Sequence, residues 1–292
     1  MHLHLVDGTY ELFRAHFSPR PPHPGPDGTP LKATVGLVSS LLALLSDPAE
    51  RPTHLAVAFD NPIRSFRNAL FDGYKTEEGV EEELLAQFDL AELATRALGI
   101  AVWSMGEFEA DDALATGAAR FASEVEQVRI MTPDKDLGQC LRGTRVVQVD
   151  RMRGKVVDEP ALRALRGIGP GSIPDWLALV GDTADGIPGL DGFGEKGAAA
   201  VLAAFERLEA IPTDPGAWPD SVRSREKLAR TFAEHRDEAF LYRTLATLRT
   251  DAPVDTSLAA LEHRGVPREP FELFARQVDA PGLLSRVPRW AA

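Results

Sequence analysis

The stretch GEFEADDALAT, residues 106–116, places three carboxylates within four positions, at Glu109, Asp111 and Asp112. Unit negative charges ~4 Å apart repel each other by about 4 kcal/mol at an effective dielectric constant of ~20. A helix start that needed only a cap could use a single aspartate. Divalent cations between the acids would offset the repulsion, and oxygen ligands without nearby His or Cys suit Mg²⁺ or Mn²⁺ rather than zinc. The triplet therefore indicates metal chemistry.

The elements that position these acids can be predicted from apolar patterns. Short runs rich in Val, Ile and Leu are typical of buried strands, and we expect strands at 3–6, 54–59, 101–105 and 128–131. Helical spacing of apolar residues alternates with these runs, at 32–46, 82–99 and 111–124. Alternation of this kind predicts an α/β fold with a mostly parallel sheet that is flanked by helices on both faces.

An acid comes directly after each expected strand. The acids concerned are Asp7, Asp60, the triplet at 109–112, and Asp134 with Asp136. Because the carboxyl ends of parallel strands meet at one edge of a sheet, we expect these seven acids to converge on one cleft. Any one of them could instead cap a helix or end a strand. That explanation accounts less well for acids after all four strands.

A second acidic segment, VGDTADGIPGLDGFGEKGAAAVL at 180–202, adds Asp182 and Asp185, whose spacing of three allows them to share a helical face. A turn rich in glycine follows, and then Lys196 and a helix rich in alanine. Small residues let the backbone approach a ligand closely, and amides at a helix start can bind phosphate. An ordinary loop can have this composition, but the adjoining aspartate pair makes the pattern more specific.

Length and composition limit the class of protein. The chain has 292 residues, enough for one large domain or two smaller ones, and its net charge of −12 argues against simple coating of DNA. It has no apolar run of the roughly 20 residues that span a bilayer, and its N-terminus resembles no secretory signal. The lone Cys140 cannot form an intramolecular disulfide, which fits a reducing, intracellular setting.

The pattern of elements changes near residue 166. Before it, 146–157 is typical of a hairpin that turns near Arg153 and Gly154; after it, helices are punctuated by Gly and Pro without clear strands. We place a domain boundary there and interpret the Pro-rich residues 18–30 as a surface loop.

One competing interpretation comes from LVDGTYEL at 5–12, which together with the later GDTAD at 181–185 resembles phosphatases of the haloacid dehalogenase type. Those enzymes use an aspartate nucleophile two residues before the Asp of their DGT segment. Leu5 occupies that place here and has no nucleophilic group. The phosphatase interpretation is therefore disfavoured.

The whole set of motifs resembles the 5′ nucleases, a family that includes flap endonucleases and the 5′-nuclease domain of bacterial DNA polymerase I. The matching segments run from about residue 3 to 250, in order: LVDGTYELFRAHF, VAFDNPIRSFR, YK, EADD, PDKD, LVGDTADGIPGLDGFGEKGA and EAFLYRTLATLRTD. The resemblance implies a PIN-like α/β nuclease domain at 1–165, with an arch near 67–90. It also implies a C-terminal helical DNA-binding domain at 166–292, with a helix–three-turn–helix near 180–205 that grips duplex DNA, often with a monovalent cation.

The resemblance also implies residue roles. The metal-binding acids would be Asp7, Asp60, Glu109, Asp111, Asp112, Asp134, Asp136, Asp182 and Asp185. They would hold two Mg²⁺ or Mn²⁺ ions that hydrolyse a DNA phosphodiester near a 5′ end. The residues implied as catalytic are Lys75, Asp7, Asp60 and Asp134. The residues implied in DNA binding are Arg67, Lys75, Gly189, Gly192, Gly194 and Lys196. Arg14 also matches, without a role that we can assign.

One departure from the family pattern concerns the arch. The bacterial family usually carries an Arg three places after the Lys of YK, where this chain has Glu78. The glutamates nearby are Glu77, Glu81, Glu82 and Glu83. We expect them to repel single-stranded DNA that threads through the arch, although acids at a helix start are also favourable in themselves. Pro133, where the family usually has Gly, is a smaller departure.

Three functions remain open at this point. The first is a metal-dependent 5′-3′ exonuclease and 5′ flap endonuclease on DNA. The second is a non-catalytic, structure-specific DNA-binding relative, and the third a PIN-like ribonuclease. For the first, we expect DNA with 5′ ends, nicks or flaps as the partner, a monomer without membrane contact, and a cytoplasmic, nucleoid-associated protein of bacterial type. The sequence names no protein partner.

Overall fold

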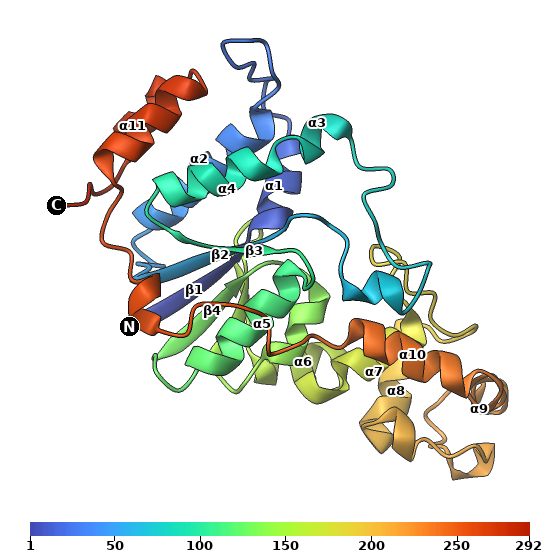
Figure 1. Cartoon of the computed structure of the whole chain (residues 1–292). Helices are drawn as coiled ribbons and strands as arrows, with labels where there is room; N and C mark the ends of the chain where they lie inside the picture. The colour runs from blue at the N-terminus through green and yellow to red at the C-terminus, as the bar shows by residue number, and fades with distance from the viewer. The chain divides into compact units, whose positions relative to one another are not determined.

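The computed structural model describes residues 1–292, which form two compact units (Figure 1). Unit 1 comprises residues 1–64, 77–132 and 250–292. Unit 2 comprises residues 65–76 and 133–249.

Unit 1 is built on four parallel strands in the order β3-β2-β1-β4. Their bounds are β1 His2–Asp7, β2 His54–Asp60, β3 Ala101–Met105 and β4 Gln127–Met131. In the middle of this sheet Leu5 pairs with Ala56 on one side and with Ile130 on the other, and all three are fully buried. Strands covered on both faces are apolar along most of their length, which is the pattern that the sequence shows. The predicted α/β class with a mostly parallel sheet is confirmed.

Helices cover both faces of these strands. Figure 1 shows α1, α2 and α4 on one side of the strands and α5 on the other. The helices of unit 1 are α1 Gly8–His16, α2 Lys32–Ser46, α3 Glu82–Leu85, α4 Phe88–Ala97, α5 Ala110–Phe121 and α11 Arg268–Gln277.

The single helix predicted at 82–99 is two helices in the structure, α3 and α4. The chain tightens at the break, where the Gln87 amide donates to Leu84 O, three residues back instead of four. The buried Gln87 side chain accepts hydrogen bonds from Thr34 N at 3.0 Å and from Thr34 Oγ1 at 3.2 Å. Thr34 lies in the first turn of α2, where backbone amides lack helical partners. The interruption therefore lets Gln87 cap a neighbouring helix.

The C-terminal segment, residues 250–292, belongs to unit 1, although it was predicted to be part of the helical domain at 166–292. The His263 amide donates to Thr53 O at 3.0 Å, and Trp103 Nε1 donates to Asp255 Oδ2 at 2.9 Å. These are contacts between residues more than 150 positions apart, and no local pattern in the sequence indicates them.

Unit 2 combines one hairpin with helices. The hairpin pairs β5 Val146–Asp150 with the antiparallel β6 Lys155–Val157, so that it turns at 151–154 as predicted. The helices are α6 Glu159–Arg166, α7 Ile173–Val180, α8 Glu195–Phe205, α9 Arg225–Glu234 and α10 Arg236–Ala246. Trp176, Leu177 and Phe232 are among the buried residues of their common core. No helix anywhere in the chain has the length and apolar character needed to cross a membrane.

Glycine ends α7 and allows the turn that carries the second acidic segment. Gly181 has φ +85°, and a Cβ there would lie 2.7 Å from both Ile187 O and Pro188 O. Only glycine fits this close approach in a left-handed conformation. The turn is closed by paired hydrogen bonds of 2.8 Å between the backbones of Asp182 and Ile187.

Candidate functional site

In unit 1, Asp7 and Asp60 end two neighbouring parallel strands, β1 and β2, as the sequence predicts. Asp7 also caps α1: its Oδ1 accepts from Tyr10 N at 2.8 Å, and its Oδ2 accepts from Thr132 Oγ1 at 3.0 Å. Thr132 directly follows β4. The Asp7 carboxylate is therefore held at the carboxyl edge of the sheet by hydrogen bonds from two elements.

Asp60 lies against the start of α5. Its Oδ1 accepts from Ala110 N at 2.7 Å, and its own amide donates to Thr9 Oγ1 at 2.8 Å. Ala110 is the first residue of α5, the helix that begins within the acidic triplet. Asp60 and the triplet thus come together in unit 1.

The acidic triplet at 109–112 also caps the start of α5. Glu109 is the N-cap of α5, and its amide donates to Asp112 Oδ2 at 3.0 Å in a capping box. Glu109 and Asp112 are buried, while Asp111 is half-buried. Acids at a helix N-terminus also interact favourably with the helix dipole. Helix capping therefore accounts for part of the acidity of this segment, and the remaining carboxylate oxygens can bind a cation.

In unit 2, Asp136, Asp182 and Asp185 form a compact cluster of carboxylates. Each offers an oxygen, and these oxygens all lie within 4.8 Å of one another. Asp134 lies two positions before Asp136 and caps the short 3₁₀ helix Lys135–Cys140. Its Oδ1 accepts a hydrogen bond from Asp136 N at 2.9 Å. The closed turn after α7 brings Asp182 and Asp185 to the same place.

Asp136 is the least compensated acid of this cluster. Burial raises its pKa well above the usual value, and the charges of Asp134, Asp185 and Asp182 raise it further. Its Oδ1 is buried and has no hydrogen-bond partner. A buried carboxylate oxygen with no donor, surrounded by other carboxylates, is a position that a divalent cation can satisfy.

Two lysines partly neutralise the cluster. Lys75 Nζ lies 2.9 Å from Asp185 Oδ1, and Lys135 Nζ lies 2.8 Å from Asp182 Oδ2. Burial disfavours the charged form of Lys135, but the hydrogen bond and charge of Asp182 outweigh it, so the pKa of Lys135 is raised. Lys135 was not among the site residues expected from the sequence, although its place between the two acids of PDKD was an available signal.

Lys75 is held in place by its backbone. Its amide donates to Asp185 O at 3.0 Å, and Asn68 Nδ2 donates to Lys75 O at 2.9 Å. A Cβ on Gly186, which has φ +75°, would lie 2.1 Å from Gly73 O. Glycine at 186 therefore allows the Lys75 segment to lie against the acidic turn. Asn68 also positions Lys75, and no pattern in the sequence indicated this role.

Arg67, expected to bind DNA, is almost completely buried, with 1% of its surface exposed. Its Nε donates to Leu245 O at 2.7 Å, and an NH2 group donates to Thr247 O at 3.1 Å. These carbonyls lie at the end of α10. The geometry favours a structural role, in which Arg67 ties residues 65–76 to α10, over contact with DNA.

The glycine-rich turn leads from α7 to α8, where the resemblance implied a helix–three-turn–helix near 180–205. Gly189 has φ +71°, with Gly181 N only 2.5 Å from where a Cβ would lie, and Gly192 has φ +84°. Gly194 is the N-cap of α8, and Lys196 lies exposed in its first turn. Exposed amides and a lysine at this helix start can bind phosphate.

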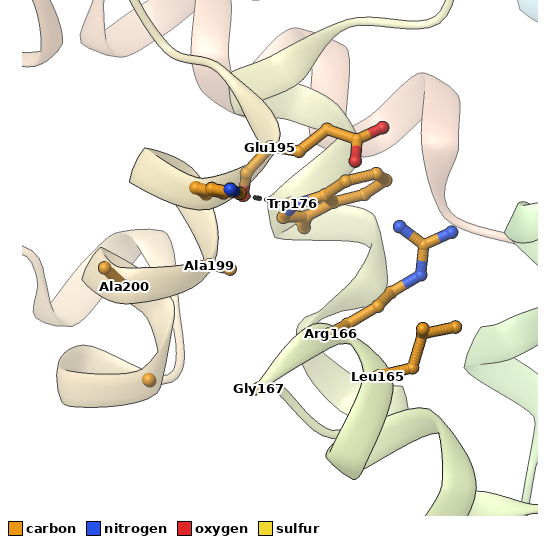
Figure 2. Close-up of a pocket in the computed structure, with 9 residues that line it drawn as sticks. Leu165, Arg166, Gly167, Trp176, Glu195, Ala199 and Ala200 are labelled. Atoms are coloured by element: carbon orange, nitrogen blue, oxygen red, sulfur yellow. Dashed lines mark hydrogen bonds between the residues drawn. The ribbon is translucent and has the colours of Figure 1, made fainter.

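A pocket of about 590 Å³ lies beside this helix start (Figure 2). Trp176 Nε1 donates to Glu195 O at 3.2 Å, and the Arg166 guanidinium lies 4.4 Å from the centre of the Trp176 ring. Figure 2 shows Leu165 and Arg166 on one side of the pocket and the alanines of α8 on the other. Trp176 thereby contacts both the start of α8 and the positively charged side chain of Arg166.

Comparison with known proteins supplies the family. A model of the 5′-3′ exonuclease N-terminal resolvase-like domain matches residues 2–164, and a model of the 5′-3′ exonuclease C-terminal SAM fold matches residues 168–269. The chain belongs to the 5′-3′ exonuclease family. The N-terminal match contains seven of the nine candidate acids, and Asp182 and Asp185 lie in the C-terminal match of this family.

Several relatives in the family share much of the sequence. A 5′-3′ exonuclease of Streptomyces coelicolor is 33% identical over 305 residues, covering 97% of this chain and 98% of that protein. DNA polymerase I of Rhizobium leguminosarum is 37% identical over 266 residues, which are 89% of this chain but 26% of the polymerase. The chain thus spans about a quarter to a third of the length of the DNA polymerase I relatives that it matches.

Solved structures show the same fold at low sequence identity. A structure of T5 5′-exonuclease with bound divalent metal ions (zinc) has a TM-score of 0.69 at 18% identity, covering 95% of this chain and 98% of that one. The catalytic core of Rad2 in complex with DNA substrate has a TM-score of 0.63 at 14% identity, covering 97% and 89%. This member of the 5′-3′ exonuclease family therefore shares its fold with T5 5′-exonuclease, which has been seen with metal ions, and with the catalytic core of Rad2, which has been seen with DNA.

Proposed function

We propose that the protein is a metal-dependent nuclease that hydrolyses DNA phosphodiesters at or near 5′ ends, both as a 5′-3′ exonuclease and as a 5′ flap endonuclease. Family membership supports the reaction type. The observation that carries the proposal is the cluster of Asp136, Asp182 and Asp185, whose oxygens lie within 4.8 Å of one another. A nucleic acid is a polyanion, so carboxylates this close together need cations between them and the substrate.

The nine candidate acids are the proposed metal ligands, and Mg²⁺ or Mn²⁺ are the proposed ions of a two-metal reaction. The unpartnered oxygen of buried Asp136 supports a cation of this hard, oxygen-preferring kind. When bound, the ions activate water and stabilise charge on the leaving oxygen. The proposed ligands are Asp7, Asp60, Glu109, Asp111, Asp112, Asp134, Asp136, Asp182 and Asp185.

The chain's own residues orient these ligands and the substrate. Hydrogen bonds from Tyr10 N and Thr132 Oγ1 fix Asp7, and the amide of Ala110 fixes Asp60, so neither carboxylate has to be ordered when a cation binds. Lys75 is the proposed cation for the scissile phosphate, since its ammonium lies 2.9 Å from Asp185 Oδ1. Fixed charges of this kind stabilise a phosphate transition state without reorganisation.

The turn between α7 and α8 is the proposed grip on duplex DNA. Its glycines, Gly189, Gly192 and Gly194, let a phosphate backbone approach, and Lys196 supplies a charge. The proposal also includes a monovalent cation at this turn. From the family alone, we further propose that the protein acts as a monomer in DNA replication or repair. Its proposed location is the cytoplasm, at the nucleoid.

The decisive experiment is a cleavage assay with purified protein on 5′-labelled flap, nicked and single-stranded DNA, and on RNA of the same sequence. We expect no cleavage in EDTA, recovery with MgCl₂ or MnCl₂, and little cleavage of RNA. Undiminished cleavage in excess EDTA would falsify the metal assignment, and a preference for RNA would favour the ribonuclease alternative.

Matched variants separate catalysis from binding. Asp182→Asn keeps the size of the side chain but removes one charge, and we expect a loss of several orders of magnitude in cleavage rate with duplex affinity nearly unchanged. Asp220→Asn is the control, because its side chain is 96% exposed in the same unit. A wild-type protein that binds DNA with metal but never cleaves it would support the non-catalytic alternative instead.

A further inference from the structure

A second pocket lies in unit 1, at the end of β2 opposite to Asp60. Its volume is about 450 Å³, within the range of small-molecule sites, and His54, the first residue of β2, lines it. Asp60 is the last residue of the same strand, so the pocket and this acid are separated by ~20 Å at ~3.3 Å per residue. The pocket therefore belongs to neither group of candidate metal ligands.

Two arginines without carboxylate partners face this pocket, Arg51 and Arg289. Arg51 Nε donates to Pro48 O at 2.8 Å, and an NH2 group of Arg289 donates to His263 O at 2.9 Å. These bonds orient both guanidiniums but leave their charges unpaired, in a chain with 44 acidic and 32 basic residues. Two such arginines at one concave site favour an anionic ligand.

The one acid in the lining does not cancel this positive charge. Glu262 is paired with Arg264, whose Nε and NH2 groups lie 3.0 Å and 2.9 Å from Glu262 Oε2. Counting Arg51, Arg289, Arg264 and Glu262 together, the charged groups around the pocket carry a net positive charge.

We propose that this pocket binds a small phosphate monoester with an organic body, of the nucleoside 5′-monophosphate class. A carboxylate has two oxygens and satisfies one guanidinium fork, whereas a phosphate monoester has three terminal oxygens and can accept hydrogen bonds from both arginines. The remaining walls include Leu45, Pro52 and Pro288, which offer an apolar surface to an uncharged ring. Size, charge and lining thus agree on one class of ligand.

Binding would join three segments that are far apart in the sequence. The pocket is lined by residues 45–54, which lead into β2, by residues 262–263, and by residues 288–289 near the C-terminus. A ligand that binds only the folded state stabilises it by mass action. A nucleoside monophosphate should therefore raise the Tm of the protein in a concentration-dependent way.

The test is calorimetric titration of the full chain with 2′-deoxyadenosine 5′-monophosphate, inorganic phosphate, deoxyadenosine and acetate. Excess EDTA keeps divalent cations away from the candidate metal ligands. We expect the monophosphate to bind more tightly than phosphate, with no detectable binding of deoxyadenosine or acetate. The variants Arg51→Ala and Arg289→Lys should each weaken monophosphate binding by about tenfold or more, since each loses a charge-assisted or forked contact.

Arg276→Ala, an exposed arginine on α11 in the same unit, is the matched control and should leave the Kd unchanged. Arg51 is bonded to one loop carbonyl, so its variant should fold even if changes at Arg289 do not. The proposal is overturned if the monophosphate does not bind at millimolar concentration, if Arg51→Ala binds like wild type, or if deoxyadenosine binds as tightly as the monophosphate. Equal affinity for phosphate and monophosphate would overturn the nucleoside part. Because the titration involves no cleavage, its outcome is independent of the proposed nuclease activity.

Discussion

Replacing Asp136 by Asn should stabilise the metal-free protein, although Asp136 is a candidate metal ligand. The substitution keeps the side-chain size and removes one buried charge close to Asp182 and Asp185. At the 4.8 Å that bounds these oxygens, two unit charges repel by roughly 3.5 kcal/mol at an effective dielectric constant of ~20. Lys75 and Lys135 bind the two neighbours, and the raised pKa of Asp136 favours its neutral acid, so that part of this repulsion is relieved. We expect a net gain on the order of 2 kcal/mol in the free energy of unfolding.

The assay is thermal unfolding by circular dichroism in EDTA, where a gain of this size raises Tm by roughly 4–8 °C. Adding millimolar MgCl₂ or MnCl₂ should raise the Tm of the wild type and have a smaller effect on Asp136→Asn, because the variant has lost a ligand. Asp220→Asn, the exposed control, should follow the wild type in both conditions. If Asp136→Asn is less stable than the wild type in EDTA, the cluster is not a site of unrelieved repulsion and the reasoning fails.

Three further predictions concern other charges. Hydrogen bonding from His4, with further support from Arg129, lowers the pKa of Glu50 to about 2 from 4.5. The stability that Glu50 contributes should therefore be complete above pH 4.5 and be lost as the pH falls toward 2. Glu50→Gln should cost up to about 3 kcal/mol at neutral pH and flatten acid unfolding, as measured by urea titrations at several pH values. Lys196→Ala should weaken duplex binding and reduce its salt slope by about one, while the cleavage rate at saturating DNA stays nearly constant; an unchanged affinity would remove Lys196 from the DNA grip. Glu78→Arg should raise cleavage of long 5′ flaps selectively over nicked duplex, and equal flap rates for both proteins would show that the charge at 78 is irrelevant.

The acids of unit 1 could be placed from sequence because two simple rules apply to them. Buried strands appear as apolar runs, and the polar residue that follows a parallel strand lies at the carboxyl edge. Asp7 and Asp60 do end β1 and β2. The spacing could not reveal which carboxylate oxygens already accept hydrogen bonds within the protein. One oxygen of Asp112, for example, accepts a hydrogen bond from the Glu109 amide.

Residues whose roles depend on distant partners were harder to interpret. Arg67 was expected to bind DNA, but its guanidinium donates to backbone carbonyls about 180 positions away, at Leu245 and Thr247. The break between α3 and α4 depends in the same way on Thr34, which lies 53 positions from Gln87. Local periodicity carries no information on such pairs, because an arginine or glutamine in a helical pattern is equally suited to solvent.

Several glutamates of the acidic arch have partners within unit 1. The sequence suggests that all five glutamates between 77 and 83 repel an incoming strand. In unit 1, however, Glu77 pairs with Arg64 at 3.2 Å, and Glu81 lies 3.1 Å from His16 Nε2. Glu82 and Glu83 lie in the first turn of α3, where the helix dipole already favours negative charge. Glu78 is the glutamate that tests repulsion of a flap most directly, because it stands where the family pattern has Arg. Because Glu78 is exposed, salt with a Debye length of ~8 Å should weaken the effect of its charge, so raising the ionic strength should reduce the difference between wild type and Glu78→Arg on flaps.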